Sequence, residues 1–515
     1  MTYRPKFYPT VVHMLNQASI EFGDEPAVIF EDRQLSYTQY ARCIAGLARQ
    51  LQGFTRGQSL RGERVALICG NSIEMAVGLF AVHASGAQVV PINPIFTAHE
   101  LNHILSDAEP IGVIYDEEIS AVVQPLFKKL NIMNYIEVGQ APDKRFDIWQ
   151  NNTKINLPEF PNPNDYATLQ YTGGTTGLPK GVNITHKQLS TNLSQREASW
   201  PTKEGQERIL CVMPLFHVFA SSMALHLAVY CKGLLNILRR YHPKTVLNSI
   251  SKDKITLLPV GPTVFIGLMG HDDFGTTEFS SLKVAYSGSA PLPEEILQRW
   301  EKLTGCPILE GYGQTEAGPV VSAVLEKSPL IAGSVGKPLI DTKVQIVDVK
   351  TGTKILEPGC RGEIRVKGPQ VMSGYRNRPI ETAEALRDGW LYTGDIGELD
   401  DLGNLYIRDR KKDMVIVSGY NVYPREIDEV LYLHEDVTAA AAVGILDEYR
   451  GEVICACVSL NRKSKTTAED LVAFCSEKLA SYKVPVQINI LSEVPKTTVG
   501  KIDKSAVKVL MSSEL

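Results

Sequence analysis

The sequence predicts an α/β protein with two parallel-sheet subdomains, then a small β-barrel, then a small α+β region. From Glu63, apolar strand-like runs (RVALICG, AQVVPIN and IGVIYD) alternate with the helical stretches SIEMAVGLFAVHASG and TAHELNHILSDAE. Such alternation favours parallel sheets covered by helices. A second stretch of the same kind contains ILCVMPL, KITLLPV and SLKVAYSG, which leads into PLPEEILQRWEKLTG. We therefore expect two α/β subdomains before the barrel.

Beyond about residue 330 the pattern changes to short strands joined by tight turns. KVQIVD, GEIRVKG and WLYTGDIGELDDLGNLYIRD are linked by Asp-Gly and Gly-Asn pairs, which favour an antiparallel sheet or barrel. After it, the helical stretch TTAEDLVAFCSEKLA opens with Thr467 and Asp470 in capping positions. We expect an N-terminal domain over residues 1–410, with a linker at 151–164, and a C-terminal domain over residues 411–515.

The composition is that of a globular protein without a polyanionic partner. The 515 residues are 44% hydrophobic and 22% charged, and the net charge is −5, so we expect no nucleic-acid partner. The nine cysteines are scattered, and Cys455 and Cys457 match neither a redox nor a zinc motif. Reduced thiols in a cytoplasmic protein are the simplest interpretation.

No segment predicts secretion or membrane insertion. The N-terminus, MTYRPKFYPTVVHML, lacks the features of a signal peptide. The most apolar run, FASSMALHLAVYC, is too short to span a membrane and contains His226, so we expect a buried segment. Transient membrane contact and a homodimer stay open.

One stretch predicts a phosphate site. YTGGTTGLPKG, at residues 171–181, holds three glycines, three threonines and Lys180. Glycines at positive φ let successive N–H groups point into one concavity, and such nests bind phosphates. The pattern fits neither the P-loop nor the Rossmann fingerprint, because Pro179 precedes the lysine and the glycines are adjacent. We predict a loop that binds the polyphosphate of a nucleotide.

Four other motifs are weaker signals by themselves. GYGQTEAG, at 311–318, predicts a second glycine-flanked loop whose carboxylate, Glu316, suits Mg²⁺ beside phosphates. YTGD places Asp395 at the end of a strand, where it could bind ribose or simply form a turn. Lys501, in PKTTVGKID, could belong to an ordinary basic loop, and His217, in PLFHVFA, could be a satisfied core histidine.

Taken together and in order, the motifs resemble those of the adenylate-forming enzymes. This superfamily includes acyl- and aryl-CoA synthetases, peptide-synthetase adenylation domains and firefly luciferase. The resemblance is carried by YTGGTTGLPKG, PLFHVFA, GYGQTE, YTGD, RDRKKDMVIVSGYNVYPREIDE and PKTTVGK, and it extends from about residue 25 to 505. It implies that a carboxylic acid attacks the α-phosphate of Mg·ATP, giving an acyl-adenylate and pyrophosphate, after which a thiol such as that of CoA displaces AMP.

The resemblance also implies two states of a mobile C-terminal domain. The domain would rotate about a hinge at Lys412, first presenting the loop of Lys501 and then the edge around Gly419. One small domain would thus serve both half-reactions, because the lysine must leave before the thiol arrives.

The resemblance further implies the site residues. Lys501 would bridge the acyl carboxylate and the α-phosphate, and Glu316 would hold Mg²⁺; the catalytic candidates are Lys501, Thr175, Glu316 and His217. The nucleotide-binding candidates are Thr172, Gly173, Gly174, Thr175, Thr176, Gly177, Lys180, Gly288, Ser289, Ala290, Glu310, Gly311, Tyr312, Gly313, Gln314, Thr315, Asp395, Ile407, Arg410, Lys412, Gly419 and Lys501. The candidates for the acid pocket are His217, Val218, Phe219, Gly261, Pro262 and Thr263.

The acid itself is less determined. PLFHVFASSMALHL contains no carboxylate to pair with a substrate ammonium, so amino acids are disfavoured. The stretch is most similar to fatty acyl-CoA synthetases, which predicts a medium- or long-chain fatty acid. An aryl-CoA ligase for cinnamate- or benzoate-like acids stays open, as does an acyl-AMP ligase that loads a carrier protein. A non-catalytic scaffold is disfavoured, because Glu316, Asp395, Arg410 and Lys501 are all present.

Overall fold

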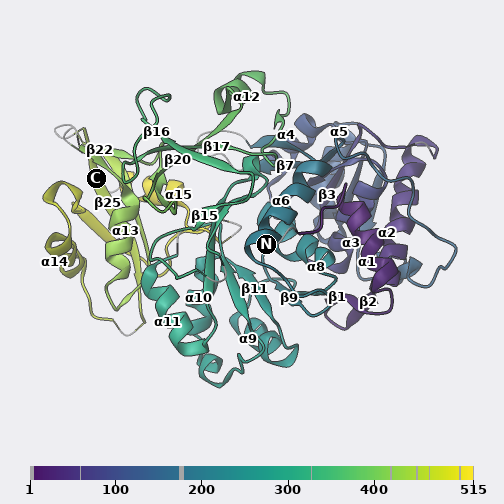
Figure 1. Cartoon of the computed structure of the whole chain (residues 1–515), viewed down its shortest axis with the longest axis horizontal. Coiled ribbons are helices and arrows are strands. Elements are labelled where there is room, and N and C mark those ends of the chain that lie inside the picture. The colour runs from purple at the N-terminus through teal and green to yellow at the C-terminus, as the bar shows by residue number, and fades with distance from the viewer. Residues whose placement is uncertain are drawn as a thin grey trace.

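The computed structural model confirms the predicted α/β class and order of regions (Figure 1). It describes residues 5–57, 59–172, 179–290, 292–325, 328–417, 420–447, 451–462, 464–497 and 500–513. In Figure 1 the N-terminal helices α1 (Val11–Glu21) and α2 (Tyr37–Gln52) lie at the right, and the C-terminal elements lie at the left.

The first sheet carries the phosphate-loop motif. Its strand order is β18-β8-β7-β4-β3-β5-β6, and the pairs among β3 to β7 are parallel. The strands are β3 (Arg64–Ile68), β4 (Gln88–Pro91), β5 (Gly112–Asp116), β6 (Tyr135–Val138), β7 (Tyr166–Thr172), β8 (Lys180–Thr185) and β18 (Gly374–Tyr375). Its connecting helices are α3 (Ile73–Ala84), α4 (Ala98–Ala108) and α5 (Ser120–Lys129). Every residue of α3 is buried, as expected for a helix enclosed on all sides.

The second sheet has the order β15-β14-β13-β12-β11-β9-β10-β1-β2. Its strands are β1 (Pro26–Phe30), β2 (Arg33–Ser36), β9 (Arg208–Cys211), β10 (Leu234–Ile237), β11 (Leu257–Val260), β12 (Val284–Ser287), β13 (Ile308–Gly313), β14 (Val320–Ala323) and β15 (Lys337–Pro338). The helices of this stretch are α6 (His186–Ser199), α7 (Val218–Ala220), α8 (Leu227–Tyr230), α9 (Pro243–Lys252), α10 (Pro262–Met269) and α11 (Glu294–Thr304). A π-helical turn at Ser221–His226 joins α7 to α8, and all of its residues except Ser221 are buried, as expected.

The third region is the antiparallel sheet expected beyond residue 330. Its order is β16-β17-β20-β19, and β21 also pairs with β20. The elements are β16 (Lys343–Val347), β17 (Gly362–Lys367), β19 (Leu386–Arg387), β20 (Trp390–Leu399), β21 (Leu405–Arg410) and the helix α12 (Pro379–Ala385).

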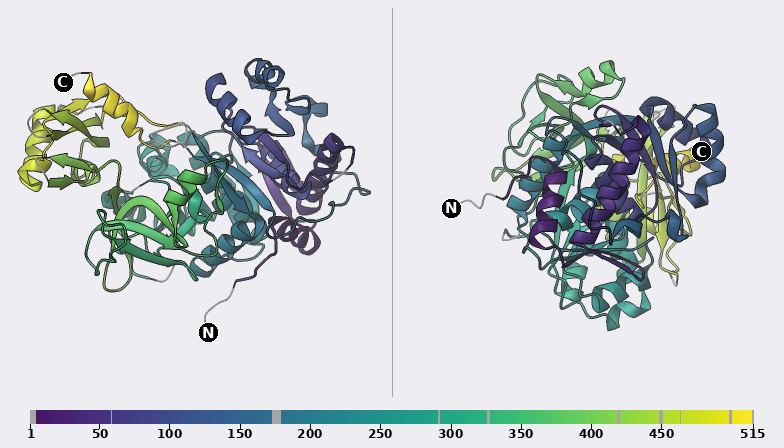
Figure 2. Two further views of the ribbon diagram at one scale, coloured as in Figure 1. Left: turned by 90° about the horizontal axis from the view of Figure 1, so that it is seen from above. Right: turned by 90° about the vertical axis from the view of Figure 1, so that its right-hand side faces the viewer.

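The C-terminal region forms a fourth sheet with its own helices. The sheet order is β23-β22-β25-β24, and β26 pairs with β25. The elements are β22 (Val415–Val417), β23 (Tyr420–Val422), α13 (Pro424–Tyr432), β24 (Val437–Asp447), β25 (Gly451–Leu460), α14 (Ala468–Lys478), β26 (Gln487–Ile490) and α15 (Lys504–Ser512). Two apolar clusters lie within this region, and the left view of Figure 2 shows it projecting beyond the larger body.

Local sequence explains where several helices begin. The predicted capping box at Thr467 and Asp470 is present at α14, with both reciprocal hydrogen bonds. The same device opens α4 at Thr97 and α6 at Thr185. Among the described residues, none of the helices combines the length and apolarity needed to cross a bilayer.

Candidate active site

Two paired strands carry the two ends of the phosphate-loop motif. Thr172, the last residue of β7, is paired in register with Lys180, the first residue of β8, and the Thr172 hydroxyl lies 3.4 Å from the Lys180 carbonyl. The intervening positions named above, Gly173, Gly174, Thr175, Thr176 and Gly177, lie outside the described residues. This pairing thus places both ends of the motif at the carboxyl end of β7, where parallel α/β sheets bind ligands.

Glu316 lies near Lys180, the first residue of β8. It belongs to the 3₁₀ turn Thr315–Ala317, and its Oε1 accepts a hydrogen bond of 3.0 Å from the Tyr375 hydroxyl. The Lys180 ammonium lies 4.4 Å from the centre of the Tyr375 ring. Burial raises the pKa of Glu316, although Tyr375 and Lys180 oppose that effect. A half-buried carboxylate close to Lys180, at one end of the phosphate-loop motif, is suited to hold Mg²⁺ beside phosphates.

A second cluster is built by strand register. Asp395 of β20 stands directly opposite Arg410 of β21, with 3.5 Å between Asp395 Oδ1 and Arg410 Nε. Tyr312, at the end of β13, donates a hydrogen bond of 2.6 Å to Asp395 Oδ2. Burial raises the pKa of Asp395 and Arg410 opposes the rise. The three side chains present a ring, a carboxylate and a guanidinium at one place.

Two local expectations for these motifs were wrong. Asp395 does not end its strand, because β20 continues to Leu399 against β21. The motif at 311–318 is not wholly a loop, since Gly311, Tyr312 and Gly313 complete β13. In both cases a neighbouring strand extends the ladder beyond the local turn signal, because cross-strand hydrogen bonds outweigh a single glycine.

The glycines around Tyr312 allow close packing. A Cβ on Gly313 would lie 1.8 Å from the carbonyl oxygen of Pro319, so no side chain fits there. A Cβ on Gly288 would lie 2.8 Å from the Phe219 ring. Ser289, which follows, has a φ of 70°, a left-handed conformation that is unusual for serine.

The remaining nucleotide candidates lie around this cluster. The Gln314 Nε2 is buried and has no hydrogen-bond partner within the described residues, which leaves a donor for a ligand. Glu310, on β13, is buried, and this burial raises its pKa to about 7. The positions not yet located are Ala290 after β12, Gly311 on β13, the buried Thr315, Ile407 on β21 and Lys412 before β22. Gly419 lies outside the described residues.

Lys501 reaches this cluster from the C-terminal region. Its neighbour Gly500 accepts a hydrogen bond of 3.2 Å, through its carbonyl, from the hydroxyl of Thr263 in α10. Burial and the charge of Arg410 lower the pKa of Lys501 to about 8, against the pull of Asp395. A partly desolvated ammonium beside Asp395 and Arg410 can accept an anion as its partner.

The acid-pocket candidates lie beside Lys501. His217 precedes α7, and its Nδ1 accepts a hydrogen bond of 3.2 Å from the Phe219 amide. Burial and the charge of Lys501 lower the pKa of His217 to about 3, so the ring is neutral. The other candidates lie in two segments, with Val218 and Phe219 in α7 and with Gly261, Pro262 and Thr263 at the start of α10.

Two residues that the sequence reasoning missed belong to this arrangement. Tyr375 links Glu316 to Lys180, but it stands in a motif, SGYRNRP, that carries no recognisable signal. Arg425, at the start of α13, is buried, donates to the carbonyl of Ile407 and opposes the raised pKa of Glu310.

Known families match most of the chain. Residues 15–376 match the family described as AMP-binding enzyme, and residues 426–501 match the AMP-binding enzyme C-terminal domain. A long-chain-fatty-acid–CoA ligase of Bacillus subtilis (strain 168) is 37% identical, over 96% of this chain and 93% of its own length. A ligase of the same name from Salmonella typhimurium is 34% identical, over 97% of this chain and 94% of its own.

Solved structures agree with this. ATP-bound MatB from Rhodopseudomonas palustris has a TM-score of 0.89 at 26% identity, covering 98% of this chain and 99% of that one. The anthranilate CoA ligase AuaEII, in complex with anthranoyl-AMP, has a TM-score of 0.91 at 25% identity, with 99% of each chain covered. The resemblance inferred from the ordered motifs is confirmed: the chain belongs to the family of AMP-binding enzymes.

Proposed function

We propose that this enzyme is an AMP-forming fatty acid–CoA ligase. It activates a medium- or long-chain fatty acid with ATP, releases pyrophosphate, and transfers the acyl group from AMP to CoA. The observation that carries the proposal is the meeting of Lys501 with Asp395, Arg410 and His217 from two regions of the chain. The long-chain-fatty-acid–CoA ligases at 37% and 34% identity favour a fatty acid and CoA over the aryl and carrier-protein alternatives.

The first half-reaction brings two anions together, and the site offers cations to receive them. The acid carboxylate attacks the α-phosphorus, the bond to the β-phosphate oxygen breaks, and pyrophosphate leaves with the electron pair. Lys501 places its ammonium between the carboxylate and the α-phosphate. Lys180 and the loop before it receive the leaving pyrophosphate. Mg²⁺, when bound, neutralises phosphate charge, and Glu316 is the residue that would hold it.

The adenosine is positioned by the cluster on β13, β20 and β21. Tyr312 offers its ring face to the base, while its hydroxyl is occupied by Asp395 at 2.6 Å. Asp395 and Arg410 offer an acceptor and donors for the ribose hydroxyls. Gln314 contributes its buried, unpaired Nε2. Positioning of this kind converts a bimolecular attack into a nearly unimolecular one.

The second half-reaction requires Lys501 to withdraw. We place the boundary between the two domains near residues 410–412 and the hinge at Lys412. Two features support it: the C-terminal region has its own apolar clusters, and the Lys501 loop contacts α10 through the bond from Thr263 to Gly500. Rotation would remove the lysine and present the edge around Gly419 to the thiol.

Location and assembly are further parts of the proposal. None of the nine cysteines, all of which lie among the described residues, forms a disulfide bond, and eight of them are buried, which supports a reducing, cytoplasmic location. Cell fractionation would test the location, flotation with lipid vesicles would test transient membrane contact, and sedimentation would test a homodimer.

The reaction is tested by supplying Mg·ATP and a panel of fatty and aryl acids, with and without CoA, and identifying the products by mass spectrometry. We expect long-chain acyl-CoA only when CoA is present. An aryl-CoA product would replace the fatty acid as substrate, and acyl-AMP that accumulates despite CoA would remove CoA as the acceptor.

A further inference from the structure

A cavity of about 450 Å³ lies away from the nucleotide cluster. Its wall includes Arg64, Gln88 and Tyr166, which are the first residues of β3, β4 and β7. The phosphate-loop motif begins with Tyr171 and Thr172, the last residues of β7, so the cavity and the start of this motif lie at opposite ends of that strand. Arg61, Tyr375 and Arg376 complete the polar part of the wall.

Arg64 is a cation without an acidic partner. Its guanidinium donates only to main-chain carbonyls, those of Gly62 and Glu109 at 3.3 Å and that of Ala108. Within the described residues, no carboxylate lies at ion-pair distance from it. Burial and the nearby charge of Arg376 lower the pKa of Arg64, against the opposing charges of Glu63 and Glu109. Arg64 and Arg376 line the same cavity, where an anion between the two guanidinium groups would offset their mutual repulsion.

Among the residues that line the cavity, arginines outnumber carboxylates. Arg376 pairs with Glu109 at 2.7 Å, and Arg61 pairs with Asp165 at 3.0 Å. Both pairs are partly exposed: the Glu109 side chain is 69% exposed and that of Arg61 51%. Such pairs hold their partners weakly in water. Glu63 and Glu109 act on Arg64 from outside the wall, and the wall itself carries three arginines and one carboxylate, Asp165.

We propose that this cavity is a binding site for a phosphate ester of a small metabolite. Arginine forks match the oxygen atoms of phosphate in a bidentate manner, and the cavity volume is within the range of small-molecule sites. Tyr166, whose side chain is half exposed at the start of β7, offers a ring face to the organic part of the ligand. The site lies beyond the ATP, acid and CoA functions proposed above.

The cavity wall is connected directly to β8, which carries one end of the phosphate-loop motif. The Arg376 amide donates to the carbonyl of Gly181 at 2.8 Å, and β18 pairs with β8 at Asn183. Tyr375 lines the cavity and also donates to Glu316. A ligand that shifts Tyr375 or Arg376 therefore changes the surroundings of Glu316 and Lys180. Because linkage is reciprocal, ATP and the phosphate ester should alter each other's affinity by the same factor.

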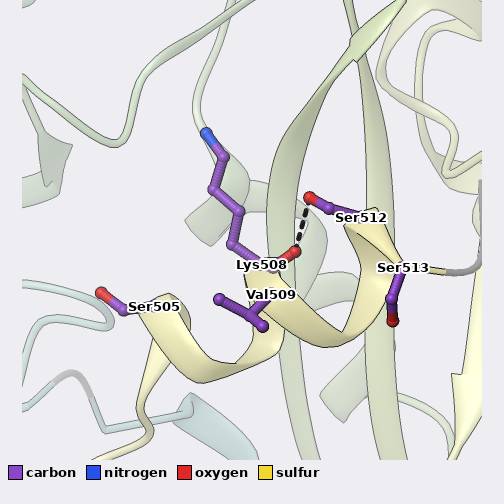
Figure 3. A pocket seen from close by; sticks show the side chains of 5 residues that line it. All are labelled: Ser505, Lys508, Val509, Ser512 and Ser513. Carbon is purple, nitrogen blue, oxygen red and sulfur yellow. Dashed lines mark hydrogen bonds between the residues drawn. The ribbon is translucent and has the colours of Figure 1, made fainter.

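A hollow of similar volume elsewhere lacks such features. It measures about 430 Å³ and is lined by Ser505, Lys508, Val509, Ser512 and Ser513. Figure 3 shows these side chains on α15 and the residue that follows it, with no opposing element among the residues that line it. The Ser512 hydroxyl is already bonded to the Lys508 carbonyl. A single lysine on a single helix is not sufficient for a binding site, so we propose no ligand for this hollow.

Binding is tested by calorimetric titration of the full-length protein with inorganic phosphate and with glycerol phosphate. We expect Arg64→Gln and Arg376→Gln each to weaken binding about 10-fold or more, since each removes a charged hydrogen-bond donor. Arg378→Gln is the matched control: Arg378 lies two residues from Arg376, does not line the cavity, and pairs with Glu381 at 3.8 Å. Glycerol phosphate that binds more tightly than phosphate would identify an ester as the ligand.

Three results would overturn the proposal: no heat of binding, unchanged affinity in both cavity variants, or an equal loss in Arg378→Gln. Lys180→Ala separates this site from the loop proposed to bind ATP, because it should spare the cavity and weaken only phosphate that occupies the loop. If Arg64→Gln fails to fold, Arg61→Gln gives the same test, since its exposed side chain carries little of the core. For the coupling, saturating glycerol phosphate should shift the ATP affinity of the unaltered protein, and this shift should shrink in Arg64→Gln; an equal ATP affinity with and without glycerol phosphate would remove the coupling.

Discussion

The two halves of the candidate active site are held in different ways. On the larger body, Tyr312, Asp395 and Arg410 are positioned by adjacent strands and by hydrogen bonds to one another. On the C-terminal side, Lys501 follows a glycine in a loop, and the bond of 3.2 Å from Thr263 to Gly500 ties that loop to α10. The residues proposed to bind the nucleotide are thus held by the strands themselves, whereas the loop of Lys501 contacts the larger body from another region of the chain.

This difference suits an enzyme with two half-reactions. Groups needed in both steps gain from a rigid scaffold, because positioning errors of even 1 Å are costly. A group needed in only one step must be able to leave, so its contacts should be few and weak. Four changes test this contrast, in order of expected effect.

Lys501→Ala should have the largest effect. It removes the ammonium between two reacting anions, and loss of one such stabilising group costs about 10²–10³-fold in rate. We expect this loss in acid-dependent exchange of pyrophosphate into ATP, and a nearly normal rate of thioester formation from preformed acyl-AMP. Lys496→Ala, a nearby exposed lysine paired with Glu493, is the control. An equal loss of rate in both half-reactions would mean that Lys501 acts in both steps, like the groups held by the strands of the larger body.

Asp395→Asn should weaken ATP about 10–100-fold, because it removes a charged hydrogen-bond acceptor worth about 1.5–3 kcal/mol. The amide can still accept from Tyr312, so the strand pairing should persist. Unlike Lys501→Ala, this variant should impair both half-reactions. The measurement is a titration of the variant with ATP and, separately, with acyl-AMP, and both affinities should fall. Asp401→Asn, in the exposed turn after β20, should change neither. A weaker affinity for ATP with an unchanged affinity for acyl-AMP would contradict the prediction that both ligands place their adenosine in the same site.

A buried histidine cluster tests the rigidity of the body. His83, His186 and His226 lie together in the core, with ring centres 5.1 Å apart for His83–His186 and 6.2 Å for His83–His226. Both ring nitrogens of His186 and His226 lack hydrogen-bond partners among the described residues. Burial lowers the pKa of His186 to about 3 and that of His226 to about 4.

These histidines are therefore neutral in the fold and become protonated in the unfolded chain below about pH 6.5. Stability is fully present above pH 6.5 and falls as pH drops toward 4, by about 1.4 kcal/mol per pH unit for each histidine. His226→Phe should reduce the dependence of the unfolding free energy on pH by about 1.4 kcal/mol per pH unit, the contribution of one histidine. The measurement is urea unfolding between pH 4 and 6.5. His99→Leu, at an exposed position, should leave this dependence unchanged. An unaltered slope in His226→Phe would mean that the ring is hydrated and not confined.

Thr263→Val should have the smallest effect. It removes the hydroxyl that donates to Gly500, a single hydrogen bond of about 1 kcal/mol, so pyrophosphate exchange should slow about 5-fold. Thioester formation from acyl-AMP should stay the same or rise, because the docked state is less populated. Thr276→Val, on an exposed turn, controls for loss of a threonine hydroxyl. A loss as large as that of Lys501→Ala would show that docking depends on this one bond.

Local sequence was sufficient for the elements of the parallel regions. Runs such as RVALICG and SIEMAVGLFAVHASG form β3 and α3 as predicted, because strand and helix periods are properties of consecutive residues. The capping box at Thr467 is equally local. The order of the motifs was likewise sufficient for the family, since each chemical group stands in a recognisable short stretch.

Sheet membership was beyond the reach of local patterns. β1 begins at Pro26 yet pairs with β10, and β18 leaves the antiparallel region to pair with β8 in the first sheet. Both pairings join residues far apart in the sequence, and no periodicity within either strand specifies its distant partner.

By itself, the sequence determined the α/β class, the family and the residue types that a nucleotide-binding ligase needs. Only the tertiary structure decided that Asp395 faces Arg410, that Tyr375 links Glu316 to Lys180, and that Arg64 and Arg376 line one cavity. The reason is that motifs encode chemistry over a few consecutive residues. Distances between motifs arise from strand register and from helices packed between the sheets.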